Sequence, residues 1–318
     1  MRKIYLSLTG GLGNQLFQLA AASAIADGDS VEVEWVNSRP RLNGLGQPEV
    51  MDFALPKNIG FQKRHKFQKL NSKSIGYLLR MGIEPRRYED FKIYKGTAAF
   101  LTSVINLSTF RRYIRIHVNQ GVGYSTRRFP KTSKSLHLIG YFQTFRWIQG
   151  DTSEEFLNNL TVREKSPELL ELINLASLES PLVVHMRFGD YRMEKSFGLL
   201  TENYYRNSIQ ELWKLGQFES IWVFSDEIEQ AKNYLKDMEI SEIKYISNVA
   251  KSSAQTLEAM RLGKGFVIGN SSFSWWAAAS SFSENPKVIA PTPWFIGQEE
   301  PIDLIPENWM RRMGHVQS

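Results

Sequence analysis

The stretch PLVVHMRFGDY, residues Pro181–Tyr191, contains the strand on which we expect the second half of the chain to be built. Residues 182–186 form a short apolar, β-branched run that follows a proline and precedes a glycine, which predicts a buried parallel strand. His185, Arg187 and Asp190 would then lie together where this strand ends. Because a guanidinium matches two phosphate oxygens at once, the cluster predicts a site for a phosphate-bearing ligand, with ordinary surface charges as the alternative.

The sequence around this stretch alternates between strand and helix patterns. Helices are expected over 167–178, 203–215, 229–238, 254–262 and 274–282, and strands over 221–224, 243–246, 265–268 and 288–290. Regular alternation of this kind predicts a doubly wound parallel sheet. Ligands of such sheets bind beyond the carboxyl ends of the strands. We therefore expect three segments to converge on one crevice: His185–Asp190, Ser225–Asp226 and Gly269–Ser274.

Two of these segments carry candidate donor-binding residues. Asp226 could accept hydrogen bonds from a guanine edge, or it could simply begin the next turn. The third segment starts a helix, so its hydroxyl and N–H groups make an anion site, with capping by Ser272 or Ser274 as the alternative. The residues of this segment expected to touch the donor are Ser271, Ser272, Phe273 and Ser274.

The N-terminus shows a second strand, glycine turn and helix. Residues 3–8 predict the strand, and Gly11 and Gly13 in the turn let backbone N–H groups approach an anion or a sugar closely. Asn14 and Gln15 add two amides at the helix start that can bind hydroxyls or phosphate, although Asn14 could instead cap the helix. A nicotinamide-dependent dehydrogenase begins in a similar way, but Leu16 stands where its fingerprint requires a third glycine.

Asp27-Gly28-Asp29 matches a pattern with which many sugar-nucleotide enzymes hold a divalent metal. It lies between the first helix and the next strand, where Asp and Gly are good turn formers, so we expect a turn and no metal site.

Length and composition limit the class of protein. At 318 residues the chain fits two domains of roughly 150 residues, expected at 1–150 and 151–318. The absence of cysteine excludes disulfides, thiolate zinc sites and thiol nucleophiles. The net charge of +6 favours an anionic partner. The excess comes from residues 57–95, which contain eleven Lys or Arg and three acids, a net of +8 that leaves −2 for the rest of the chain. This basic, loop-rich insert predicts a solvated face near an anionic membrane, or a nucleic-acid or polyanion binder as an alternative.

Four separated motifs resemble the bacterial α-1,2-fucosyltransferases of glycosyltransferase family eleven. They are GGLGNQLFQ at residues 10–18, HMRFGDY at 185–191, FSD at 224–226 and NSSFSWWA at 270–277. The resemblance implies an α/β chain with GT-B architecture, in which two Rossmann-like domains face a cleft. It also implies an acceptor-side N-terminal domain and a C-terminal domain that binds the GDP-sugar.

The activity implied by the resemblance is inverting, metal-independent transfer of fucose from GDP-fucose to a glycan acceptor, expected at the 2-OH of a galactoside. No cofactor is implied beyond this donor substrate. We expect no nucleic acid as a partner and a cytoplasmic location, where the basic segment allows peripheral association with an anionic membrane. The family precedent puts Arg187 on the diphosphate with His185 beside it, Asp226 near the guanosine, residues 272–274 on the phosphates and the Asn14 loop against the donor.

The chain departs from the family pattern at two places. Phe188 replaces the second of two adjacent arginines, and Ser253-Ala254-Gln255 stands where a pair of acids is frequent, so acceptor or linkage could differ. A base near the attacking hydroxyl would help an inverting displacement, and the candidates are Asp190, His185 and Glu194. The remaining hypotheses are an NAD-dependent dehydrogenase that uses the N-terminal glycine loop and a polyanion binder that uses residues 57–95.

Overall fold

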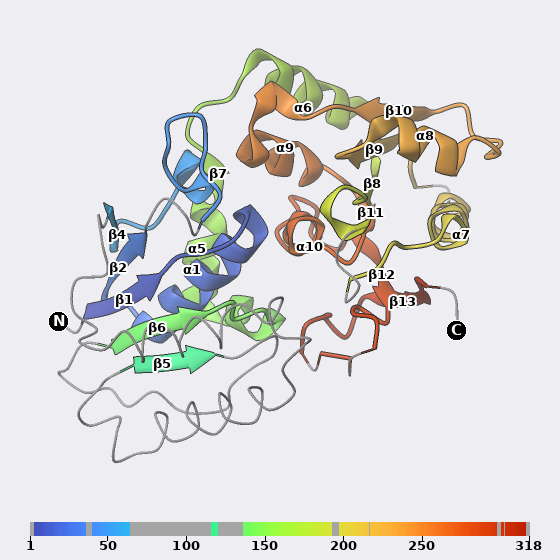
Figure 1. Ribbon diagram of the computed structural model, residues 1–318. Coiled ribbons are helices and arrows are strands. Elements are labelled where there is room, and N and C mark those ends of the chain that lie inside the picture. Colours follow the sequence, from blue (N-terminus) through green and yellow to red (C-terminus); the bar gives the residue numbers. More distant parts are fainter. Residues whose placement is uncertain are drawn as a thin grey trace. The chain divides into compact units, whose positions relative to one another are not determined.

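The computed structural model describes residues 3–35, 40–63, 116–119, 136–192, 197–215, 217–297, 300–301 and 303–315 (Figure 1). The chain splits into two compact units, one of Met1–Leu160 with Ile302–Leu304 and the other of Thr161–Pro301 with Ile305–Ser318. The sequence predicted a boundary at residue 150. The division falls after Leu160 because helix α5 (Asp151–Asn159) packs against helix α1 (Leu12–Ala26) of the first unit.

The first unit is built on a five-stranded parallel sheet with the order β4-β2-β1-β6-β5. Its strands are β1 (Lys3–Ser7), β2 (Ser30–Trp35), β4 (Ile59–Lys63), β5 (Ile116–Asn119) and β6 (Leu136–Gly140). Shorter elements are η1 (Glu49–Asp52), β3 (Phe53–Ala54) and η3 (Phe145–Ile148). The central strand β1 buries Ile4 and Leu6 completely, and α1 packs on β1 and β2 through its apolar side. The loops that follow β1 and β6 therefore begin at neighbouring positions of one sheet edge.

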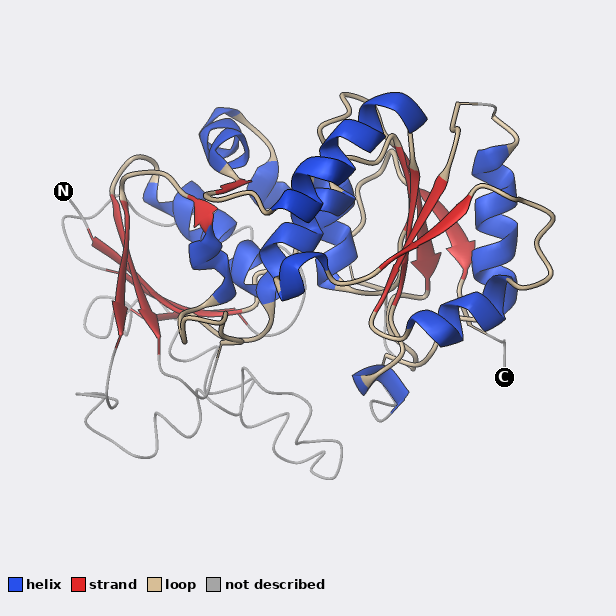
Figure 2. Ribbon diagram, turned by 90° about the horizontal axis from the view of Figure 1, so that it is seen from above, coloured by secondary structure: helices blue, strands red, loops and turns tan. Residues whose placement is uncertain are grey.

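The second unit contains a six-stranded parallel sheet with the order β10-β9-β8-β11-β12-β13. Its strands are β8 (Leu182–Met186), β9 (Ile221–Ser225), β10 (Ile243–Ile246), β11 (Gly265–Val267), β12 (Lys287–Thr292) and β13 (Met310–Met313). Its helices are α6 (Pro167–Glu179), α7 (Glu202–Trp213), α8 (Ile228–Leu235), α9 (Ser253–Met260) and α10 (Ser272–Ala279), and the short elements are β7 (Thr161–Val162), η4 (Asp190–Arg192) and η5 (Val249–Lys251). Helices lie on both faces of the sheet (Figure 2).

The strand order identifies the second unit as a Rossmann-like fold. Counted from β8 as the first strand, the order is 3-2-1-4-5-6, in which β8 and β11 flank the point where the connections change direction. The prediction of an α/β chain with two Rossmann-like units is confirmed. The predicted cleft between the units stays a prediction.

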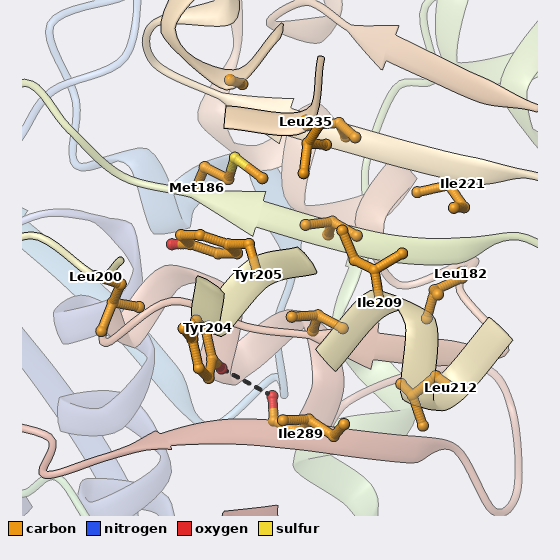
Figure 3. Packing of buried hydrophobic residues seen from close by; sticks show 14 of the residues in the cluster. Leu182, Met186, Leu200, Tyr204, Tyr205, Ile209, Leu212, Ile221, Leu235 and Ile289 are labelled. Carbon is orange, nitrogen blue, oxygen red and sulfur yellow. Dashed lines mark hydrogen bonds between the residues drawn. The ribbon is translucent and has the colours of Figure 1, made fainter. Parts of the chain in front are cut away.

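Strand β8 lies in the core of the second unit. All five of its residues are buried, because helices cover both faces of the sheet. Leu182, Val184 and Met186 belong to the same apolar cluster as residues of α7, and Figure 3 shows Ile209 and Leu212 of that helix in this cluster. Trp275 and Trp276 of α10 are fully buried, as expected of a helix packed tightly in the fold.

Two tyrosines in the first turn of α7 hold the ends of the central strands. The Tyr204 hydroxyl donates to the carbonyl oxygen of Ile268 at 2.6 Å and to that of Ile289 at 3.4 Å, the second of which Figure 3 draws. Tyr205 is equally buried, and a backbone hydrogen bond from Arg187 reaches its side chain. Burial raises the pKa of both hydroxyls well above the usual range. The contacts with Ile268 and Arg187 lie at the ends of β11 and β8, where the candidate site begins.

Candidate functional site

The candidate site of the second unit lies at the carboxyl edge of its sheet. Strand β8 has β9 and β11 as its two neighbours, so the three loops predicted to converge start side by side. Direct contacts join them. The backbone N–H of Phe188 donates to Asp226 across β8 and β9, and the Tyr191 hydroxyl donates to the carbonyl oxygen of Asn270 at 3.2 Å across β8 and β11. Ligands of this fold class bind at such a change in strand order.

Arg187 is held between two carboxylates. Its Nε and Nη2 lie 3.0 and 2.9 Å from Oδ1 of Asp190, and its Nη1 lies 3.3 Å from Oδ2 of Asp226. The Arg187 side chain is 23% exposed, whereas that of Asp190 is 47% exposed. A guanidinium has five N–H donors, more than these three contacts use, so Arg187 keeps donors for a further acceptor.

Asp226 binds the turn that carries Arg187. Its Oδ1 accepts from the N–H of Phe188 at 3.0 Å, and its Oδ2 accepts from the N–H of Gly189 at 3.1 Å. A Cβ atom on Gly189 would lie only 2.6 Å from Oδ2, so glycine is required for this close approach. The sequence expected this carboxylate to lie near a guanosine. In the structure both of its oxygens contact groups of the chain itself.

His185 is the buried member of the cluster. Its side chain is 6% exposed, its ring centroid lies 5.7 Å from that of Phe273, and its Nδ1 has no hydrogen-bond partner among the described residues. Burial, assisted by the nearby charge of Arg187, lowers the pKa of His185 to about 3. The ring is therefore neutral at pH 7 and a weak proton acceptor. Among the candidate bases this favours Asp190 over His185, while Glu194 lies outside the described residues.

The low pKa of His185 predicts a loss of stability in mild acid. Below pH 6.5 His185 becomes protonated in the unfolded chain, whereas in the folded chain it becomes protonated only near pH 3. The free energy of unfolding therefore falls as the pH drops through that range. Between pH 7 and pH 5 the loss from this residue is about 2 kcal/mol. Thermal unfolding of the wild type and His185→Phe across this range measures it. If the free energy of unfolding depends on pH in the same way in both proteins, His185 is not the cause of the loss.

The start of α10 uses two of its serines internally. Ser271 is the N-cap, and its hydroxyl accepts from the N–H of Phe273 at 3.3 Å. The buried Ser274 hydroxyl bonds the carbonyl oxygens of Gly269 and Ser271 at 3.3 and 3.1 Å. The alternative of capping by Ser272 or Ser274 was wrong. The N-cap is Ser271, which has the extended conformation that an N-cap needs. Ser272 and Phe273 are half-buried, and their contact with a phosphate stays a prediction.

At the start of α1 a buried carboxylate accepts a hydrogen bond from the first residue of the helix. The helix begins at Leu12, and Gly11 is its N-cap, without a side-chain hydrogen bond. The N–H of Leu12 donates to Oε2 of Glu49 at 3.0 Å, and Glu49 is only 5% exposed. The proposed cap by Asn14 was wrong, because Asn14 lies inside the helix. Sequence reasoning missed Glu49 because 37 residues separate it from its partner.

Gln15 is a structural residue in this unit. Its Nε2 donates to the carbonyl oxygens of Gly10 and Arg41 at 2.9 and 3.0 Å, and its Oε1 accepts from the N–H of Val50 at 3.0 Å. The side chain is fully buried. Both N–H donors of the amide are therefore used by the chain, which leaves Gln15 poorly placed for the donor-binding role that the sequence predicted.

Asn14 occupies the corresponding sheet edge of the first unit. Its Oδ1 accepts from Nε2 of Gln143 at 2.6 Å, which joins the first turn of α1 to the loop after β6, the strand next to β1. Asn14 is half-buried, as is Gly11, whereas Gly13 is buried in the helix. Gly10 has φ +79°, and a Cβ atom there would lie 2.7 Å from Nδ2 of Asn14, so this turn needs glycine. Donor contacts of Gly11, Gly13 and Asn14 stay predictions.

Asp27-Gly28-Asp29 forms a turn, as expected. Asp27 is the C-cap of α1 in a left-handed conformation, and the N–H of Asp29 donates to the carbonyl oxygen of Ala26. Within the described ranges no group of three or more His, Asp or Glu side chains is placed to hold a metal ion. Most of the basic segment 57–95 lies outside the described residues, which end at Lys63 and resume at residue 116.

The residues at the two departures from the family pattern contact other parts of the second unit. Phe188 is 2% exposed, its ring meets that of Tyr234 edge to face at 4.9 Å, and the Arg192 guanidinium lies 5.9 Å above it. Phe188 therefore adds no charge to the site. The Oε1 of Gln255 accepts from the N–H of Ser166, the N-cap of α6, at 2.8 Å.

Comparison with known proteins identifies the family. A family model described as glycosyl transferase family 11 matches residues 120–302, which is more than half of the chain. The chain belongs to glycosyltransferase family 11. Family 11 membership confirms the resemblance carried by the four motifs and the prediction that the protein is a glycosyltransferase. It does not support the alternative of a dehydrogenase built on the N-terminal glycine loop.

Relatives of this family 11 chain match along nearly its whole length. An alpha-1,2-colitosyltransferase of Escherichia coli is 29% identical over 98% of this chain and 99% of its own. The O-antigen biosynthesis glycosyltransferase WbnK, also of Escherichia coli, is 24% identical over 96% and 99%. Among solved structures, the alpha-1,6-fucosyltransferase NodZ soaked with GDP-fucose is 13% identical over 88% of this chain and 92% of its own, with a TM-score of 0.48. No helix in the described part of the family 11 chain is long and apolar enough to span a membrane.

Proposed function

We propose that the protein is an inverting, metal-independent fucosyltransferase that moves fucose from GDP-β-L-fucose to the 2-OH of a galactoside in a surface glycan. The observation that carries the proposal is Arg187, a partly exposed guanidinium at the change in strand order of a Rossmann-like unit. Support for the linkage comes from the relative named as an alpha-1,2-colitosyltransferase, and support for the pathway from the relative named for O-antigen biosynthesis.

The reaction forms a bond between the acceptor oxygen and the anomeric carbon and breaks the bond from that carbon to the β-phosphate. Arg187 neutralises the departing GDP, with N–H groups at the start of α10 as further donors. Because two carboxylates already contact Arg187, the diphosphate has to replace at least part of these contacts. Asp190 is the more exposed of the two acids and the one expected to release the guanidinium. Once released, it can accept the proton of the attacking hydroxyl.

A colitosyl donor is the second candidate. It is favoured by the relative that is named for colitosyl transfer and is 29% identical over almost the whole chain. Colitose is the 3-deoxy counterpart of fucose. A colitosyl donor that carries GDP would offer Arg187 the same leaving group as GDP-fucose and would differ from it at one hydroxyl of the sugar.

Incubation of the protein with GDP-fucose or GDP-colitose and a panel of galactosides tests both candidates. We expect an α-1,2-linked product and release of GDP with one donor, at a rate that EDTA does not change. Product linkage is read by methylation analysis or NMR. A protein that neither transfers nor hydrolyses either donor, and that fails to bind GDP, would contradict the proposal. Inhibition by EDTA that Mg²⁺ or Mn²⁺ reverses would contradict metal independence alone.

We further propose that the reaction takes place in the cytoplasm, with the basic segment 57–95 as a peripheral contact to anionic lipid. The excess of eleven basic over three acidic residues in this segment supports the lipid contact.

A further inference from the structure

Asp226 lies directly beside Arg187 because of the register of two central strands. Met186 pairs with Ser225 at the ends of β8 and β9, so the next residue of each strand is Arg187 on one side and Asp226 on the other. The Asp226 carboxylate makes three contacts there, two with backbone N–H groups at 3.0 and 3.1 Å and one with the Arg187 guanidinium at 3.3 Å. From this geometry we infer that Asp226 is a positioning residue, which holds the turn 187–189 so that Arg187 is presented to a diphosphate. The inference rests on the proposed function.

The contacts of Asp226 argue against a direct role in reading a guanine base. A guanine edge would present two N–H donors to the two carboxylate oxygens. Each oxygen already accepts from a backbone N–H, and Oδ2 also contacts Arg187, so a base would have to share these acceptors with the chain. Turning the carboxylate toward a base would leave both backbone N–H groups without their partner, which is unfavourable in a partly buried turn. The Asp226 side chain is 23% exposed, as is that of Arg187.

The surroundings of Asp226 also keep it in place. The Ser225 hydroxyl accepts from the N–H of Glu227 at 3.0 Å, which fixes the backbone on either side of Asp226. The carboxylate of Glu227 in turn contacts the Arg192 guanidinium at 2.5 Å, so the loop after β9 is joined to the turn after β8 a second time. Among the contacts of the described residues, Asp190 is not held by two backbone N–H groups in this way. The two acids around Arg187 therefore differ: Asp226 stays with the turn, and Asp190 can leave.

The test compares ligands that carry a diphosphate with ligands that carry only the base. Asp226→Asn keeps the size of the side chain but removes its charge and replaces one acceptor by a donor. By calorimetric titration we expect the affinities for GDP, inosine diphosphate and inorganic pyrophosphate to fall by the same factor, roughly ten- to a hundred-fold, while guanosine binds as before. The ratio of the GDP and inosine diphosphate affinities should not change.

A second variant tests the same role with the carboxylate in place, in case Asp226→Asn does not fold. Gly189→Ala puts a Cβ atom 2.6 Å from the same Oδ2 and so disturbs the turn without removing the carboxylate. It should lower diphosphate affinity in the same pattern as Asp226→Asn. Glu229→Gln, which removes an exposed carboxylate that pairs with Lys232 within α8, is the matched control and should bind all four ligands like the wild type.

The results separate this inference from the proposed function. If the wild type transfers fucose or colitose but Asp226→Asn or Gly189→Ala loses guanosine affinity or the preference for GDP over inosine diphosphate, the positioning role is refuted and the proposed function stands. Diphosphate affinities in both variants that equal those of the wild type would refute it as well. If the wild type binds neither GDP nor pyrophosphate, both proposals fail.

Discussion

Replacing Arg187 by alanine is expected to lower kcat of sugar transfer by roughly 10²- to 10³-fold, the usual cost of losing one group that stabilises charge in a transition state. In the proposed reaction, negative charge grows on the β-phosphate as GDP departs, and Arg187 directly follows the last residue of the central strand β8. Arg187→Lys keeps a positive charge but loses the two-point geometry, so its rate should lie between those of the wild type and the alanine variant.

Single-turnover transfer with saturating GDP-sugar measures this effect, because it separates the chemical step from donor binding. Arg312→Ala is a suitable control, since Arg312 lies on the edge strand β13 and forms an exposed ion pair with Glu211 of α7. It should change kcat less than two-fold. An Arg187→Ala variant that retains more than a third of the wild-type rate would show that another group carries the leaving-group charge.

The local pattern of the sequence predicted the second unit well because its central strands are apolar throughout. Strand β8 was expected over 182–186 and occupies these residues, and strands β9 and β11 were placed to within one residue. Strand β13 (Met310–Met313) was missed. It lies at the sheet edge and carries two exposed arginines, so it lacks the apolar signature of a strand.

The candidate site was predictable in position but not in its internal contacts. The rule that parallel sheets bind ligands at their carboxyl edge needs only the strand order, so the sequence located Arg187, Asp226 and Asn270 at one edge. Which groups accept from which donors depends on contacts across tens of residues. Asp226 contacts Phe188 at a separation of 38 residues, and no local pattern reports that bond. The burial that keeps His185 neutral is likewise a property of the packed fold.

Replacing Asp190 by asparagine is expected to lower kcat by roughly 10²- to 10⁴-fold, the range typical of a lost general base, without weakening GDP binding. The two effects have separate causes. The carboxylate is the acceptor proposed for the proton of the attacking hydroxyl, so its removal slows transfer. It is also a counter-ion of Arg187 at 2.9 Å, so its removal lets the guanidinium meet the diphosphate without competition. GDP affinity should therefore stay equal or rise.

This opposite response of rate and affinity distinguishes a base from a residue that only holds Arg187 in place. Asp237→Asn is the matched control, because Asp237 is an exposed acid that pairs with Arg206 in the same unit, and it should change neither quantity. If Asp190→Asn weakens GDP binding as much as it lowers kcat, Asp190 acts by positioning the guanidinium. If the rate stays within three-fold of the wild type while GDP binds more tightly, Asp190 is a counter-ion alone, and the attacking hydroxyl loses its proton to another group or only after the bond to GDP has broken.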